Sequence, residues 1–381
     1  MDFSLSEEQQ AFFDTARAFG ADQIAPFAAE WEEQGSIPRA LLREAAALGF
    51  AGIYVAEDGG GSGLKRLDAA LIFEALSMAC PSVASFISIH NMCAGMIDRY
   101  GAPDLRADWL PKLCSFETVA SYCLTEPGSG SDAAALRTRA RADGPDYVLD
   151  GTKAFISGGD FSDLYVVMCR TGEDGPKGIS TVLVEAGSEG LSFGAQEKKM
   201  GWKAQPTAQV QFDAVRVPQT NRLGGEGQGF TFAMQGLDGG RLNIAASALG
   251  GAQTCLDKAI AYTQERKAFG QSLSEFQALQ FKLADMETEL QAARTFLYRA
   301  AWSLDEGRAD ATKLCAMAKR FVTDVSFTVA NEALQLHGGY GYLADYGIEK
   351  IVRDLRVHQI LEGTNEIMRV IVARALLGGA R

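Results

Sequence analysis

The sequence predicts an α+β protein with an N-terminal helical domain, a middle antiparallel β domain and a C-terminal four-helix bundle. Apolar residues recur at helical spacing through about the first 115 residues and again from about residue 229. Between about residues 119 and 222, short β-rich runs alternate with turn residues instead. We therefore expect domains at 1–117, 118–228 and 229–381 in this 381-residue chain, which is 47% hydrophobic and can form large cores.

The N-terminal part contains recognisable helix starts. Ser6 and Gln9 have the spacing of a capping box, in which each side chain bonds the backbone N–H of the other residue. Pro38 fits the first turn of a second helix, where its missing N–H costs nothing. Helical patterns continue over 67–78 and 86–100.

The middle part reads as strands separated by tight turns. The β-rich runs lie at 147–149, 164–168, 179–184 and 209–212. Asp-Gly pairs, which favour tight turns, lie at 143–144, 150–151 and 174–175. Because no long helix interrupts this stretch, antiparallel strands in a small barrel or sandwich fit better than a parallel sheet.

The C-terminal part has four long helical segments. They cover 230–264, 274–306, 309–336 and 346–377. Four segments of this length predict a four-helix bundle.

Charge and composition exclude several classes of function. The net charge is −12 and no run of Lys or Arg exceeds two residues, so we expect neither a nucleic-acid surface nor an anionic-membrane surface. The seven cysteines contain no Cys-x-x-Cys pair, and the three histidines lack ligand spacing, so we expect reduced cysteines and no metal site.

The N-terminus lacks the basic and apolar regions of a signal peptide and is too acidic for a transit peptide. No apolar run reaches the length of a membrane span, so we expect no membrane insertion. We expect a bacterial cytoplasmic protein; a processed mitochondrial matrix protein is the alternative.

Glu362 is the most informative single residue. It follows an apolar turn and stands between Leu361 and Gly363. If its side chain is buried, loss of water raises its pKa toward working pH and makes it a usable general base. The alternative is an ordinary acid at the start of the last helix.

Residues 122–132, at the start of the β region, are rich in hydroxyl side chains and glycines. Glycines allow backbone N–H groups to approach a ligand closely, and Ser and Thr offer donors and acceptors. An ordinary loop is the alternative.

These strings resemble motifs of the acyl-CoA dehydrogenases. Residues 122–132 resemble the family's first signature, and 360–369 with the preceding 353–354 resemble the second. Residues 266–270 and 337–341 are similar to two further flavin-contacting stretches. The resemblance covers nearly the whole chain and has the same helical, β, helical order.

The resemblance implies oxidation of a saturated acyl-CoA thioester to its trans-2-enoyl form with FAD. Glu362 would remove the α-proton. Its backbone N–H and a ribityl hydroxyl of the flavin would polarise the thioester carbonyl, as in an oxyanion hole. The β-hydrogen would leave as hydride to flavin N5.

The resemblance also implies the FAD contacts. Those within the chain are Tyr122, Leu124, Thr125, Ser131, Phe155, Ile156, Ser157, Thr364 and Glu366. Those serving the FAD of a neighbouring subunit are Arg266, Phe269, Gln335, Gly338 and Gly339. From the residues alone, Arg266 could instead be a cation at a helix C-terminus, and Gly338 with Gly339 an ordinary helix stop.

For the acyl-CoA, the resemblance implies contacts from Ser131, Asp238, Arg241, Leu361 and Gly363. A surface ion pair is the alternative for Asp238 and Arg241, with Arg241 at the start of a long helix. We expect Leu361 and the 88–92 region to shape a short pocket that takes a methyl branch.

Within the family, 86–94, 153–158, 165–172 and 357–363 are similar to the branch that oxidises isobutyryl-CoA in valine breakdown. A short-chain or 2-methylbutyryl-CoA dehydrogenase, an acyl-CoA oxidase and a silent acyl-CoA-binding flavoprotein are the alternatives. Implied partners are electron-transferring flavoprotein as acceptor and three further copies of the chain in a homotetramer built as a dimer of dimers.

Overall fold

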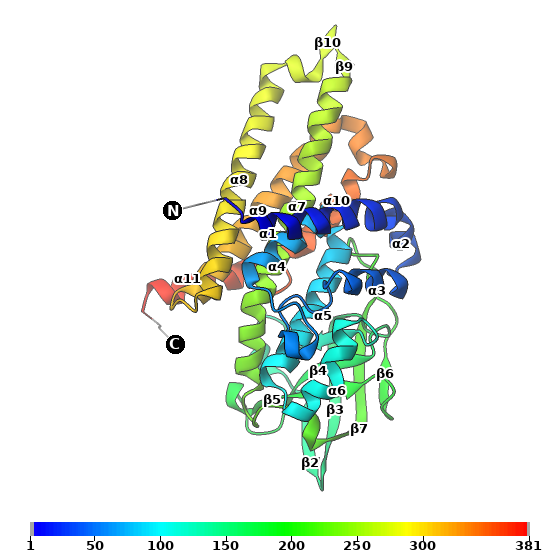
Figure 1. The fold of residues 1–381 in the computed structure, drawn as a ribbon, viewed down its shortest axis with the longest axis vertical. Helices are drawn as coiled ribbons and strands as arrows, with labels where there is room; N and C mark the ends of the chain where they lie inside the picture. Colours follow the sequence, from blue (N-terminus) through cyan, green and yellow to red (C-terminus); the bar gives the residue numbers. More distant parts are fainter. Residues whose placement is uncertain (1–3, 379–381) are drawn as a thin grey trace.

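The structure, a computed structural model, describes residues 4–378 and divides them into the three expected parts. Figure 1 shows long helices at one end of the molecule, a β-sheet at the other and the N-terminal helices across the middle. The predicted boundaries after residues 117 and 228 fall in the connections before β1 and before α7. These boundaries stay predictions.

The N-terminal part is helical, as predicted. Ser6 Oγ accepts from the Gln9 backbone N–H at 3.1 Å and Gln9 Oε1 accepts from the Ser6 N–H at 3.2 Å, which confirms the capping box. Pro38 is the residue before its helix and not in its first turn, a shift of one position. The helices are α1 (Glu7–Phe19), α2 (Ala28–Gln34), α3 (Arg39–Ala47), α4 (Arg66–Ser77), α5 (Pro81–Tyr100) and α6 (Pro103–Cys114).

The middle part is one mixed sheet in the order β6-β7-β3-β2-β4-β5-β8, with β1 also on β4. Most neighbours pair antiparallel, as predicted, but β1 and β4 pair parallel from Ala120–Leu164 to Cys123–Val167, and β2 and β4 pair parallel at Arg139–Arg170. The strands are β1 (Ala120–Cys123), β2 (Arg139–Asp143), β3 (Asp146–Ser157), β4 (Leu164–Arg170), β5 (Ile179–Glu185), β6 (Leu191–Phe193), β7 (Thr207–Pro218) and β8 (Arg222–Leu223).

One of the three predicted Asp-Gly turns is wrong. Asp150 and Gly151 lie inside β3, where the register against β7 shifts between Leu149 and Gly151. Gly151 has a φ of 148° and packs against Thr138 so closely that a Cβ atom would lie 2.5 Å from Thr138 Oγ1. The pair therefore makes a bulge, another structure that requires glycine.

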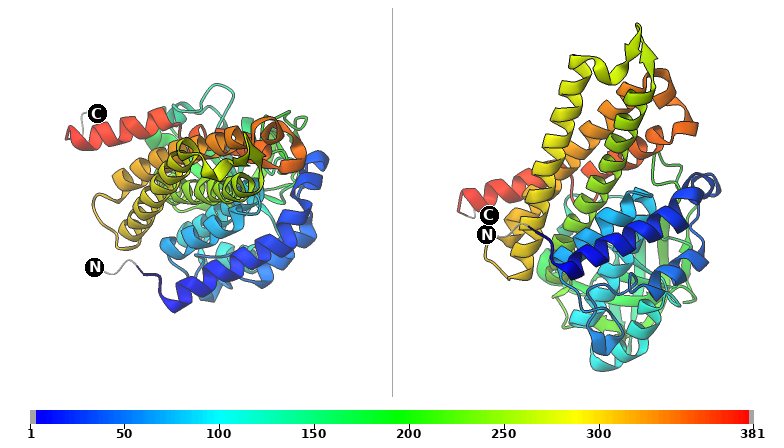
Figure 2. Two further views of the ribbon diagram at one scale, coloured as in Figure 1. Left: turned by 90° about the horizontal axis from the view of Figure 1, so that it is seen from above. Right: turned by 45° about the horizontal axis from the view of Figure 1, so that its top comes forward.

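The C-terminal part departs from the prediction in its fourth segment. Helices α7 (Gly229–Glu265), α8 (Gln277–Asp305) and α9 (Ala311–His337) run side by side (Figure 1), with the small hairpin of β9 (Lys267–Ala268) and β10 (Gln271–Ser272) at their tip. The expected continuous helix over 346–377 is instead α10 (Ile348–Arg356) and α11 (Asn365–Leu376). In both views of Figure 2, α11 extends sideways from the bundle.

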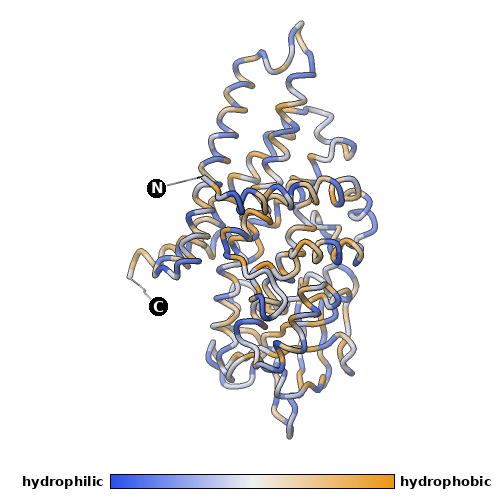
Figure 3. Tube along the Cα trace, viewed as in Figure 1, coloured by the Kyte–Doolittle hydropathy of each residue, from blue (hydrophilic) through white to orange (hydrophobic). Residues whose placement is uncertain are grey.

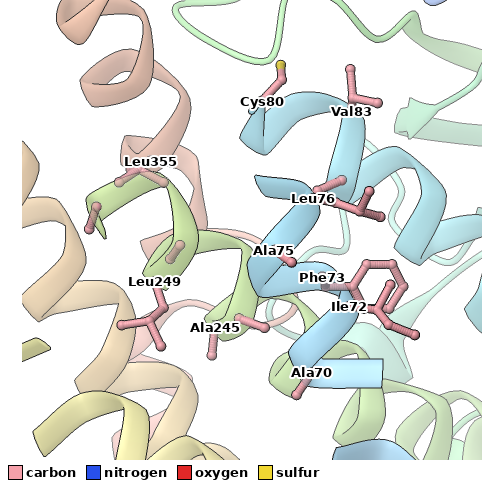
Figure 4. Packing of buried hydrophobic residues seen from close by; sticks show 14 of the residues in the cluster. Ala70, Ile72, Phe73, Ala75, Leu76, Cys80, Val83, Ala245, Leu249 and Leu355 are labelled. Carbon is pink, nitrogen blue, oxygen red and sulfur yellow. The ribbon is translucent and has the colours of Figure 1, made fainter. Parts of the chain in front are cut away.

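The core forms where α4 crosses α7. Figure 4 shows Ala75 of α4 between the two helices near Ala245 of α7, with Leu249 of α7 and Leu355 of α10 in the same buried cluster. Along α8 the trace alternates between hydrophilic and hydrophobic residues (Figure 3), as expected of a helix with one face on the core. Helix α7 is therefore the central element, and its middle turns are buried on all sides.

Among residues 4–378, no helix is both long and apolar enough to cross a membrane. Within the same residues, no group of three or more His, Cys, Asp or Glu side chains is arranged to hold a metal ion.

Candidate active site

Glu362 lies on the turn that separates α10 from α11. Its φ is 55°, and that of Gly363 is 88°. The N-cap of α11 is Thr364, whose side chain accepts from the Ile367 N–H at 3.3 Å, so Glu362 precedes the helix and is not a first-turn acid. A non-glycine residue held in the left-handed region costs on the order of 1–3 kcal/mol and tends to mark functional positions.

The Glu362 carboxylate is seated against Gly240 in the middle of α7. A Cβ atom built on Gly240 would lie 2.5 Å from Glu362 Oε2. The residue as a whole is half-buried, yet Oε2 is buried and has no hydrogen-bond partner among the described residues. Burial raises the pKa of Glu362 from 4.5 to about 7, and Arg241 and Lys319 act against this rise.

Asp238 and Arg241 sit beside this turn as a buried pair. Arg241 Nη1 donates to Asp238 Oδ1 at 2.7 Å, and Thr312 Oγ1 donates to Asp238 Oδ2 at 2.6 Å. Arg241 Nε also donates to the Glu362 carbonyl at 3.4 Å. Both residues are buried, so a surface ion pair is excluded, and Arg241 lies well inside α7 and not at its start.

Lys319 of α9 is a contact that the sequence reasoning missed. It is fully buried, and its Nζ donates to the Gly363 carbonyl at 2.8 Å and to Asn365 Oδ1 at 2.9 Å. Burial lowers its pKa to about 7, against the opposing effect of Glu362. The sequence did contain a sign that Lys319 is buried, because it lies one helical turn after the apolar Cys315 and so on the same face of the helix.

Tyr122, Leu124 and Thr125 lie on or just after β1. The Tyr122 hydroxyl is buried without a partner among the described residues. Its burial, and secondly the negative charge of Glu362, raise the pKa of this hydroxyl well above its ordinary value. Thr125 O accepts from the Ala154 N–H at 2.8 Å, which ties this segment to β3.

Lys153 and Glu126, also missed by the sequence reasoning, hold the same segment in place. Lys153 Nζ donates to Glu126 Oε1 at 2.8 Å and to Leu124 O at 3.0 Å, and both residues of the ion pair are buried. Glu126 also accepts from the backbone N–H groups of Arg137 and Thr138.

Phe155, Ile156 and Ser157 end β3 next to the 122–126 segment. Phe155 has a φ of 57° and is 67% exposed, whereas Ile156 is buried. The Ser157 carbonyl accepts from Ser121 Oγ at 2.5 Å. The structure therefore brings the two predicted flavin-facing segments together around an exposed aromatic ring.

Ser131 is exposed in the loop after Glu126. A hollow of about 350 Å³ beside this loop is lined by Glu126, Gly128, Arg137 and Thr152 and does not reach Glu362.

Leu361 and Gly363 flank Glu362 on its turn, and both are half-buried. Glu366 is exposed in the first turn of α11, where hydrogen bonds from its own backbone N–H and from Thr364 lower its pKa.

A second set of predicted residues lies far from Glu362 in this chain. Arg266 ends α7, and a rise of ~1.5 Å per residue places it about 40 Å from Gly240. Phe269 beside it is 96% exposed with a φ of 53°. A hollow of about 680 Å³ at this end is lined by several side chains and glycines, among them Arg266, Gln335, Gly338, Gly339 and Tyr340.

The comparisons with known proteins agree with this architecture. The family models for the acyl-CoA dehydrogenase N-terminal, middle and C-terminal domains match residues 6–117, 121–215 and 227–377. The chain is 54% identical to the mitochondrial isobutyryl-CoA dehydrogenase of Bos taurus and 55% identical to that of Dictyostelium discoideum, each over 98% of this chain and 90% of the relative.

Among solved structures, butyryl-CoA dehydrogenase from Megasphaera elsdenii superimposes with a TM-score of 0.96 at 38% identity, covering 99% of this chain and 100% of that one. The chain therefore belongs to the acyl-CoA dehydrogenase family of flavin-dependent oxidoreductases that act on a CH–CH bond.

Proposed function

We propose that this protein oxidises isobutyryl-CoA to methacrylyl-CoA in valine breakdown, with Glu362 as the base that removes the α-proton. One observation carries the role of Glu362. Its Oε2 is buried without a partner, on a strained turn, with a pKa of about 7. A carboxylate with that pKa is ionised often enough near neutral pH to accept a proton and basic enough to hold it.

The chain's own groups account for the proton step. The α C–H bond breaks, its proton goes to a Glu362 carboxylate oxygen, and its electron pair forms the new double bond. The Glu362 backbone N–H stabilises the negative charge that develops on the thioester oxygen. Bound FAD would supply the hydride acceptor for the β-hydrogen, and this would balance the two-electron oxidation.

The residues present fit FAD. The exposed ring of Phe155 offers an apolar face to a planar ring system, and the buried Tyr122 hydroxyl has an unused hydrogen-bonding capacity. We assign the contacts within the chain to Tyr122, Leu124, Thr125, Ser131, Phe155, Ile156, Ser157, Thr364 and Glu366.

The predicted FAD contacts that lie far from Glu362 support an oligomer. Because Arg266 and its neighbours lie about 40 Å from Gly240 along α7, we infer that they hold the FAD of another copy of the chain. Gly338 and Gly339 leave open space where a Cβ would point, and Phe269 is almost fully exposed. We propose a homotetramer, a dimer of dimers. Sedimentation of a monomer with full FAD content would contradict this.

The relatives support a short branched acyl group. We propose that Leu361 and the 88–92 region limit the pocket, and that Ser131, Asp238, Arg241 and Gly363 contact the acyl-CoA. Flavin bleaching should be measured anaerobically with isobutyryl-, 2-methylbutyryl-, isovaleryl- and butyryl-CoA. We expect isobutyryl-CoA to give the highest second-order rate constant, and a preference for butyryl-CoA would contradict the assignment.

We propose electron-transferring flavoprotein as the electron acceptor, not oxygen. After anaerobic reduction by isobutyryl-CoA, the flavin should reoxidise slowly in air and rapidly when that protein is added. Rapid peroxide formation in air would instead indicate an acyl-CoA oxidase.

A further inference from the structure

Three side chains beside the Glu362 site carry buried polar atoms that have no hydrogen-bond partner among residues 4–378. They are the hydroxyl of Tyr54, the Nη1 of Arg66 and both amide atoms of Asn243. Asn243 is 1% exposed. Buried polar atoms in native proteins are nearly always paired, so a cluster of unpaired ones calls for an explanation.

These side chains converge from three separate elements. Tyr54 follows α3, Arg66 opens α4, and Asn243 lies in the middle of α7. The Arg66 guanidinium lies over the Tyr54 ring, 3.7 Å from its centroid. Burial raises the pKa of Tyr54, and the charge of Arg66 together with polar interactions from Arg66 and Asn243 partly offsets this rise. The three polar groups therefore lie close together, but no pair of them has both the distance and the angles of a hydrogen bond.

The cluster lies beside the Glu362 carboxylate along α7. Gly239 and Gly240 are consecutive in α7, and a Cβ on Gly239 would lie 2.5 Å from Arg66 Nη1, just as a Cβ on Gly240 would lie 2.5 Å from Glu362 Oε2. The Arg66 guanidinium and the Glu362 carboxylate therefore lie against consecutive residues of α7.

We propose that Tyr54, Arg66 and Asn243 form a polar subsite that hydrogen-bonds the acyl-CoA away from its reacting carbons. The guanidinium and amide N–H groups donate to carbonyl oxygens, and Asn243 Oδ1 accepts an N–H. Apart from its thioester carbonyl, which the Glu362 backbone N–H would engage, an isobutyryl group offers neither an acceptor nor an N–H, whereas the amides of the pantetheine arm offer both. A polar substituent on the acyl group is the other source of the same chemistry. The inference rests on the proposed acyl-CoA function.

The test uses the FAD-loaded full chain carrying Glu362→Gln, so that ligands bind without turnover. Tyr54→Phe and Arg66→Met are added singly, and the Kd values of isobutyryl-CoA and 3-hydroxyisobutyryl-CoA are measured by calorimetry. We expect both to bind at least about 10-fold more weakly in the Arg66→Met variant, as for a lost pair of hydrogen bonds from a charged donor.

Loss confined to 3-hydroxyisobutyryl-CoA would assign the subsite to a polar acyl substituent. Unchanged Kd values for both ligands would overturn the proposal. If the Glu362→Gln parent binds neither ligand, the proposed function fails instead, which separates the two failures.

Thermal stability separates binding from a structural role. Because the Tyr54 hydroxyl has no partner in the ligand-free protein, Tyr54→Phe should leave its Tm unchanged or higher while weakening ligand binding. Arg39→Met is the matched control: Arg39 also lies over an aromatic ring, 4.8 Å from the centroid of Phe161, but is paired with Asp163. It should lower the Tm and leave both Kd values unchanged. A Tyr54→Phe variant with a lowered Tm and unchanged Kd values would show a structural role only.

Discussion

Replacement of Gly240 by alanine should slow catalysis by about 100-fold without weakening the fold. The new Cβ would lie 2.5 Å from Glu362 Oε2 and 3.0 Å from its Cδ, whereas ordinary contact begins at 3.4 Å. The carboxylate must therefore move by about 0.9 Å. A displacement of ~1 Å in a reacting group can lower the rate by about 100-fold. In a helix interior, alanine is also favoured over glycine by ~1 kcal/mol, so stability should not fall.

The measurement is the rate of flavin bleaching by isobutyryl-CoA in a stopped-flow instrument, with the Tm recorded for each variant. Gly236→Ala is the matched control in the same helix, because its Cβ would meet Met96 Sδ at 3.4 Å, an ordinary contact. We expect about 100-fold slower bleaching for Gly240→Ala and near-normal bleaching for Gly236→Ala. A stable Gly240→Ala protein with the wild-type rate would refute the placement of the Glu362 carboxylate.

Three further outcomes follow from the charges. Because burial holds the pKa of Glu362 at about 7, the rate of flavin bleaching should rise with pH through a midpoint near 7. Between pH 4.5 and about 7 the folded protein keeps a proton on Glu362 that the unfolded chain has lost, so the ligand-free protein should lose stability as the pH rises through this range. Glu362→Gln should remove this loss. Lys319→Met removes a cation that lowers the pKa of Glu362, so the midpoint should move to higher pH, and an unchanged midpoint would argue against this coupling. Lys153→Met leaves Glu126 buried without its cation and should cost ~3–5 kcal/mol in urea unfolding, while adding Glu126→Gln should recover part of this loss.

The order of helical and β regions could be predicted because it rests on local periodicity. The break at 357–364 could not, because the apolar pattern continues through Ile360 and Leu361 as it would in a helix. Helix α10 already ends at Arg356 and is followed by a 3₁₀ turn over Val357–Gln359. The left-handed backbone at Glu362 and Gly363, held by contacts with α7 and α9, then redirects the chain into α11. The turn predicted at Asp150 and Gly151 was wrong for a similar reason, because tight turns and β-bulges both favour this pair of residues.

The site was found from the sequence only in part. Glu362 stood out by its neighbours and by family resemblance, but Gly240, Lys319 and Arg66 come from helices whose approach to that turn depends on the whole fold. One signal was present: Gly236, Gly239 and Gly240 fall within two turns of a predicted helix, where each glycine costs ~1 kcal/mol relative to alanine and so indicates close packing.

The most direct measurement mixes isobutyryl-CoA anaerobically with wild-type and Glu362→Gln proteins and follows flavin absorbance. The variant should keep its FAD and bind the ligand, yet bleach at least about 100-fold more slowly, the low end for loss of a general base. Bleaching of the variant at the wild-type rate would show that another group removes the proton.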